Sequence, residues 1–169
     1  MYVKTRKIVF LAIMISISVV LSIVESLISV VFIPGVKLGL ANVITLIILM
    51  TFSDKDAFTV VMARLLIVAL TYSGLFSNSF WISLSGGLFA ITSMIIIKKF
   101  KFSIYGISVL GSTMHMVGQV LAAMTLADPA LAVILPYLVM LAVPTGLLTA
   151  FLSSKIILSL EDKFIFFSK

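Results

Sequence analysis

Cysteine is absent from this chain of 169 residues, and histidine occurs only once. Without cysteine the protein forms no disulfide, no thiolate metal site and no cysteine nucleophile. A single histidine also argues against a metal centre, because such sites need several nitrogen or sulfur ligands. The sequence contains no nucleotide-binding motif and no ligand set for haem or iron–sulfur clusters. We therefore expect no metal site and no intrinsic cofactor.

Charged residues are also scarce, at 11%, whereas hydrophobic residues make up 62% of the chain and the mean hydropathy is +1.33. No soluble domain of this size has such a composition. We predict an all-α polytopic membrane protein, with residues 1–169 forming a single transmembrane domain in the lipid bilayer. The net charge of +6 does not indicate nucleic acid as a partner, because lysine and arginine lie at the ends of apolar segments rather than along a folded polar groove.

The apolar residues form six segments, which we expect to be six transmembrane helices. They cover residues 8–32, 38–52, 57–72, 80–97, 104–126 and 130–152. A straight span needs about 20 residues. The second and third segments are shorter, so we expect them to extend into flanking polar residues or not to cross fully. Only the polar break at residues 53–56 separates these two segments. The alternative is a count of five spans, in which the two segments form one overlong helix.

The basic residues predict the orientation of the bundle. With six spans and a cytoplasmic N-terminus, ten of the twelve lysines and arginines fall on the cytoplasmic side, Lys37 falls outside and Arg64 lies within a span. We expect both termini in the cytoplasm, with residues 1–7 as a basic N-terminus and residues 153–169 as an interfacial tail. A cleaved signal peptide is the alternative for the first segment, but no A-x-A-like site ends it. These features predict a multi-pass protein of the bacterial cytoplasmic membrane.

Five polar side chains fall at membrane depth: Glu25, Asn42, Arg64, His115 and Gln119. A permanent cation such as Arg64 costs several kcal/mol there unless protein, water or a bound anion meets it. We interpret the group as the lining of a ligand site. For Arg64 the alternative is a structural clamp with Glu25 or with backbone.

The first segment carries one polar face, formed by Ser18, Ser22, Glu25 and Ser29 at helical spacing. This face is either a packing surface, with Glu25 reaching outward to the interface, or part of a ligand pocket. Ala12 and Ser16 form a separate pair of small residues, rotated about 130° from that face at 100° per residue.

The fifth segment places Gly111, His115, Gly118 and Ala122 on one face, with Gln119 beside it. His115 is either a hydrogen-bonded packing residue or a contact to a ligand or to Glu25. Because imidazole titrates near neutrality, a role in quinone binding or proton relay also stays open.

The second segment begins after Pro34 and Gly35. Its free backbone amides, together with Lys37, predict a site for an anionic group, with Asn42 one turn deeper. The alternative for Lys37 is that it lies at the membrane interface without a ligand.

These residues together resemble a known family. The segments PGVKLGLANVITL (34–46), SLSGGL (83–88) and FSIYGISVLG (102–111), with Arg64, His115 and Gln119, are similar to the Gx transporter family, also described as heptaprenyl diphosphate synthase component I. Members of that family commonly have asparagine after the histidine, where this chain has Met116. The resemblance extends to the S components of energy-coupling factor transporters. It implies an S-component-like bundle with an outward-facing pocket, and it implies that Ala12 and Ser16 dock a coupling subunit.

Three functions follow from the residues and the resemblance. The first is a substrate-binding subunit for a small vitamin-like, flavin or isoprenoid-related molecule, which needs separate transmembrane coupling and ATPase subunits. The second is a quinone-interacting subunit of flavin-based extracellular electron transfer, with an extracytoplasmic flavin-binding partner and bound flavin or quinone. The third is a non-catalytic accessory of a prenyl diphosphate synthase. Catalysis by this chain is not expected, because its four aspartates form no DDxxD motif for Mg²⁺ and diphosphate.

Overall fold

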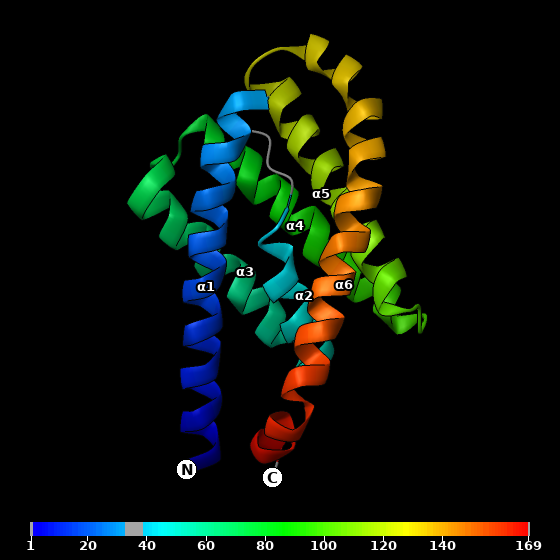
Figure 1. Cartoon of the computed structure of the whole chain (residues 1–169). Helices are drawn as coiled ribbons and strands as arrows, with labels where there is room; N and C mark the ends of the chain where they lie inside the picture. The colour runs from blue at the N-terminus through cyan, green and yellow to red at the C-terminus, as the bar shows by residue number, and fades with distance from the viewer. Residues whose placement is uncertain (1, 33–38, 169) are drawn as a thin grey trace.

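The computed structural model describes residues 2–32 and 39–168, with side chains placed at 5–27 and 39–159. Helices account for nearly all of these residues, and no strand occurs among them. Figure 1 shows the arrangement of the helices as a single bundle. The helices are α1 (Tyr2–Phe32), α2 (Asn42–Thr51), α3 (Asp54–Val68), the π-helix η1 (Ala69–Ser73), α4 (Asn78–Lys99), α5 (Ile104–Leu126), the 3-10 helix η2 (Pro129–Ile134) and α6 (Leu135–Ser168). The predicted all-helical class is confirmed.

Five of the described helices are long and apolar enough to cross a membrane. The third predicted segment does extend into flanking residues, because α3 begins at Asp54 and η1 continues it to Ser73, giving 20 residues. The second segment stays short: α2 has 10 residues, about 15 Å of helix against roughly 30 Å of hydrocarbon. The bundle therefore combines five long helices with one half-length helix.

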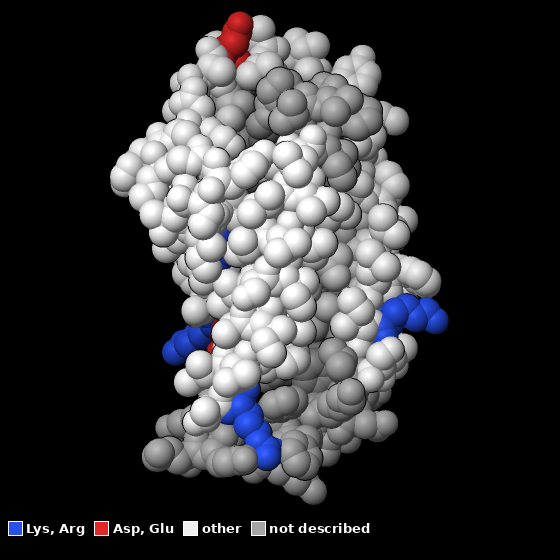
Figure 2. All heavy atoms as spheres, turned by 60° about the vertical axis from the view of Figure 1, so that its left-hand side comes forward, with Lys and Arg blue, Asp and Glu red and all other residues white. Residues whose placement is uncertain are grey.

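The outer surface of the bundle suits lipid. Large apolar side chains are exposed along α1 and α6, among them Ile13, Val20, Tyr137 and Met140. Figure 2 shows one face whose middle is almost free of charged groups, with lysine and arginine in its lower part and an acidic group at the opposite end. The two chain termini lie at the same end of the molecule (Figure 1), which is compatible with both being on one side of the membrane.

Glycines bring α4, α5 and α6 into close contact. A Cβ on Gly118 of α5 would lie 2.8 Å from the carbonyl oxygen of Ser85, and one on Gly146 of α6 would lie 2.7 Å from the Cα of Val109. Between α4 and α3, a Cβ on Gly87 would lie 3.0 Å from a methyl of Leu65. Helices α3 to α6 are thus joined by close contacts at glycine that larger residues would prevent.

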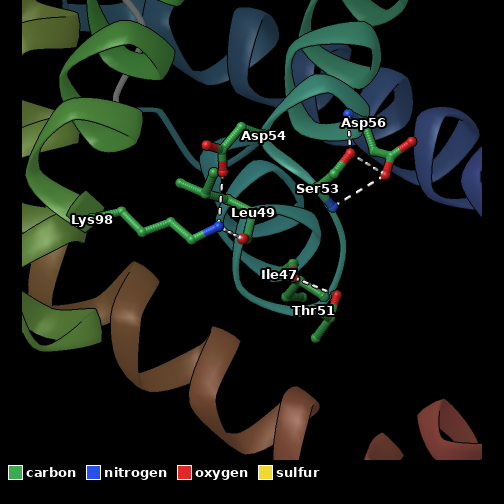
Figure 3. Close-up of polar contacts among 7 residues, drawn as sticks. All are labelled: Ile47, Leu49, Thr51, Ser53, Asp54, Asp56 and Lys98. Atoms are coloured by element: carbon green, nitrogen blue, oxygen red, sulfur yellow. Dashed lines mark hydrogen bonds and ion pairs between the residues drawn. The ribbon is translucent and has the colours of Figure 1, made fainter. Parts of the chain in front are cut away.

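Helix α2 lies at the centre of the bundle, and residues 41–49 are all buried. Its C-terminus needs partners, because the last carbonyls of a helix lack intrahelical donors. The ammonium of Lys98, from the end of α4, donates to the carbonyl of Leu49 at 2.7 Å and to Asp54 Oδ1 at 2.8 Å. Figure 3 shows this group reaching the α2–α3 turn, where Ser53 and Asp56 form the capping box that begins α3. A cation from α4 therefore caps the negative end of α2.

Replacing Lys98 by methionine should destabilise the fold, because the apolar stem is kept while the hydrogen bond to the Leu49 carbonyl is lost. We expect a loss of about 1–3 kcal/mol in the free energy of unfolding. Lys99→Met is the matched control, since Lys99 is exposed on the same helix turn, and it should change stability by less than about 0.5 kcal/mol. Chemical unfolding in mixed micelles measures both variants, and equal effects would contradict a capping role for Lys98.

Candidate functional site

A small polar cavity lies where α1, α3, α4 and α5 meet the start of α2. Its lining consists of Ser22, Glu25, Gly39, Ala41, Asn42, Arg64, Leu65, Ser83 and His115. The volume open to the centre of a water-sized sphere is about 20 Å³, enough for roughly one water molecule. Four of the predicted site residues, from four different helices, therefore meet around one cavity.

Glu25 caps the N-terminus of α2. The backbone N–H groups of Gly39 and Leu40 both donate to its Oε1, the second at 3.1 Å. Gly39 has φ +91°, a conformation that glycine adopts without strain and that turns its amide toward α1. The Glu25 side chain is only 2% exposed, so it does not reach outward to the interface. The anion predicted at this helix N-terminus is thus already present as the protein's own carboxylate.

Arg64 lies across the cavity with unsatisfied donors. It is 3% exposed, and its Nε and Nη1 atoms have no hydrogen-bond partner among the described residues. The Glu25 carboxylate is near enough to interact with it electrostatically. Asn42, 1% exposed, also presents an Nδ2 group without a partner in the described part of the chain. Buried donors of this kind are costly unless an acceptor meets them, so the cavity favours a group rich in oxygen acceptors.

His115 completes the wall on the α5 side and is 5% exposed. The absence of a side chain at Gly86 of α4 makes room for it, since a Cβ there would lie 3.1 Å from His115 Cε1 and 2.6 Å from Gln119 Cγ. Gln119 is fully buried, but it packs against Gly86 and does not line the cavity. The structure therefore brings His115 into the candidate site and places Gln119 behind it.

The remaining predicted residues lie elsewhere. Lys37 is outside the described residues. Ala12 and Ser16 are exposed on α1, where the Ser16 hydroxyl donates to the carbonyl of Ala12 at 3.0 Å, and their docking role stays a prediction.

Ser83 of α4 lines the cavity and was not singled out from the sequence. It is 8% exposed, and its hydroxyl has no partner among the described side chains and backbone groups. Ser22, from the polar face of the first segment, also reaches the cavity. Two sequence signals could have found Ser83: it begins the SLSGGL segment, and its spacing of three residues from Gly86 puts both on one helix face.

A larger hollow of about 470 Å³ runs between α4 and α5. Trp81, Leu88, Phe89 and other mostly apolar side chains line it. The hydroxyl of Ser85, which also lines it, donates to the Gly118 carbonyl, so it is satisfied within the protein. This groove suits hydrocarbon and offers little to orient a polar molecule.

The fold and the cavity together define a polytopic helical membrane protein with a buried polar site. A family model for heptaprenyl diphosphate synthase component I matches residues 14–156, and the chain belongs to this family. The matched region includes every residue that lines the polar cavity. Neither the curated proteins nor the solved structures include a match to this chain.

Gly86→Ala should destabilise the bundle by about 1–3 kcal/mol, because the added methyl overlaps Gln119 and His115 in a packed interior. Gly106→Ala is the matched control: its Cβ would lie 3.2 Å from the exposed Phe102 ring and 3.7 Å from Ser103 Oγ, an ordinary contact. That control should cost less than about 1 kcal/mol, since alanine is the better helix former. Thermal unfolding in detergent compares the two, and equal losses would contradict tight packing behind His115.

Exchanging the charges of Glu25 and Arg64 should not restore stability. Each single reversal should cost about 3–5 kcal/mol through a buried uncompensated charge. In the double variant an arginine would face the N–H donors of Gly39 and Leu40 at the positive end of α2, so we expect a remaining loss of at least about 2 kcal/mol. A double variant as stable as the wild type would show that Glu25 and Arg64 form a simple ion pair.

Proposed function

We propose that this protein is a membrane-embedded binding component that holds a small molecule through an acceptor-rich group. The observation that carries the proposal is Arg64, a buried cation whose Nε and Nη1 donors face the cavity without a hydrogen-bond partner in the described chain. A structural arginine is normally paired on most of its donors. Unpaired donors at membrane depth lower the stability of the fold. A ligand that supplies acceptors would offset this loss, which explains why such donors are kept.

The ligand class follows from the cavity and the family. Family membership associates the chain with prenyl diphosphate synthesis, which favours an isoprenoid-related molecule among the vitamin-like, flavin and isoprenoid candidates. Such a molecule has acceptor-rich phosphate oxygens at one end and hydrocarbon at the other. Its apolar part would remain among the apolar side chains of the bundle or in lipid. Uptake of this ligand, as in S components, would require separate coupling and ATPase subunits.

The same proposal assigns no catalytic role to the chain. Asp54 and Asp56 are the closest pair of aspartates in the sequence, and both are engaged in structural contacts. Asp54 pairs with Lys98 at 2.8 Å, and Asp56 pairs with Lys7 at 2.7 Å while capping α3. No group of three or more potential metal ligands occurs among the described residues. These contacts support a binding component rather than a synthase.

A second candidate function is a non-catalytic accessory that recruits a prenyl diphosphate synthase. The family description favours it, since a numbered component implies a partner chain. Co-purification of the synthase with the wild type and equally with Arg64→Met would support this function in place of ligand binding.

Arg64→Met should abolish ligand binding without lowering stability. The Gly39 and Leu40 amides still stabilise the Glu25 carboxylate in this variant, and two unpaired buried donors are removed. We therefore expect the free energy of unfolding to stay within about 1 kcal/mol of the wild type. Thermal-shift measurements on the purified chain, with isoprenyl diphosphates, flavins, vitamins and quinones, should reveal a stabilising ligand for the wild type and for the control Arg6→Met, but not for Arg64→Met.

A stability loss of about 3–5 kcal/mol in Arg64→Met would instead indicate a structural clamp. No stabilising ligand for the wild type would overturn the proposed function.

A further inference from the structure

We infer that the cavity at the N-terminus of α2 is an anion subsite whose built-in occupant is the Glu25 carboxylate, and that an anionic ligand binds by displacing it. The inference rests on the proposed function and specifies the ligand group as a compact anion with several oxygen acceptors, such as a phosphate or diphosphate.

The first argument is the inventory of donors around the cavity. The Gly39 and Leu40 amides point to one place, and the buried donors of Arg64 and Asn42 line the same space without partners among the described residues. The two amides donate to one oxygen of the Glu25 carboxylate, and neither Arg64 Nε, Arg64 Nη1 nor Asn42 Nδ2 donates to it. A phosphate group, with three or more acceptor oxygens, could accept from the amides and from Arg64 at once.

The second argument is the size of the cavity. With the Glu25 carboxylate on the amides, the remaining space of about 20 Å³ holds roughly one water molecule. A phosphate group therefore cannot enter beside Glu25 and must take its place. Repulsion leads to the same result, because two anions in contact in a buried site strongly oppose each other.

The third argument is the position of Glu25 on a different helix from the donors. Gly39, Asn42 and Arg64 belong to α2, its entry turn and α3, whereas Glu25 comes from α1. The α1 span is less enclosed than the span that carries Arg64, with 28% of its most apolar window buried against 39% for α3 and η1. Withdrawal of Glu25 therefore leaves the donor set in place.

The test measures binding of inorganic diphosphate to the full chain in phosphatidylcholine nanodiscs, by calorimetry at constant ionic strength. Glu25→Gln keeps the shape of the side chain and one carbonyl acceptor for the amides but removes the competing charge. We expect its Kd for diphosphate to fall by about tenfold or more. Asp128→Asn is the matched control: it removes the same charge from an exposed residue, and its Kd should change by less than about twofold.

A second measurement keeps the inference testable should Glu25→Gln fail to fold. Infrared difference spectra of Asp128→Asn, with and without diphosphate, should show a shift of a carboxylate stretching band as Glu25 leaves the amides. A second set of nanodiscs containing phosphatidic acid distinguishes the source of the phosphate group. Stabilisation by phosphatidic acid that depends on Arg64 identifies a lipid headgroup, and stabilisation by diphosphate alone identifies a soluble ligand.

An unchanged or higher Kd in folded Glu25→Gln, or diphosphate binding without a carboxylate band shift, would overturn the inference. Failure of both diphosphate and phosphatidic acid to bind would overturn it as well. In that case the proposed function survives only if an uncharged ligand still stabilises the wild type and not Arg64→Met.

Discussion

The capping of α2 by charged side chains from two other helices is the constraint on which this structure depends. A helix of about 15 Å cannot reach both faces of a bilayer of about 30 Å, so the backbone groups of at least one end lie inside the protein. In α2 this is the N-terminal end, where Gly39, Ala41 and Asn42 are buried. Without water these groups must find partners in the protein. Glu25 from α1 meets the positive end, and Lys98 from α4 meets the negative end, where Asp54 shares the ammonium group. Each charge complements the helix dipole, so one short helix accounts for two ionised groups within or beside the apolar region.

The engagement of Glu25 explains the chemistry left in the cavity. If both oxygens of this carboxylate accepted from Arg64, fewer guanidinium donors would lack partners. Because the α2 amides use one of its oxygens, Arg64 and Asn42 keep donors without partners among the described residues. The unpaired N–H groups of Arg64 and Asn42 share this cavity with the hydroxyl groups of Ser22 and Ser83. Under the proposed function, selectivity for an acceptor-rich ligand follows from how α2 is capped.

Much of this site could be predicted from the sequence, because polar residues in apolar helices are costly and face inward. The spacing of Ser18, Ser22 and Glu25 gave the buried face of α1, and Asn42, Arg64 and His115 do meet. The sequence could not show which partner each residue has, since helical periodicity defines a face but not the depth at which another helix crosses it. For that reason, only the structure shows that Glu25 and Lys98 cap α2. It also shows that Gln119 packs against Gly86 and does not line the cavity. The short second segment was anticipated from its length alone.

The small volume of the cavity also follows from these contacts. In an open polar pocket at membrane depth, the α2 amides and the Arg64 guanidinium would depend on water for hydrogen-bond acceptors. The Glu25 carboxylate gives the amides an acceptor from the protein instead. Enlarging the cavity between α3, α4 and α5 would separate the close glycine contacts at Gly86, Gly87 and Gly118. Moving α1 would leave those contacts intact, because its opposite face has no protein neighbour among the described residues and exposes Ile13, Val20 and Leu27. Since α1 also carries Glu25, a displacement of α1 would, under the proposed function, both make room for a ligand and remove the competing carboxylate.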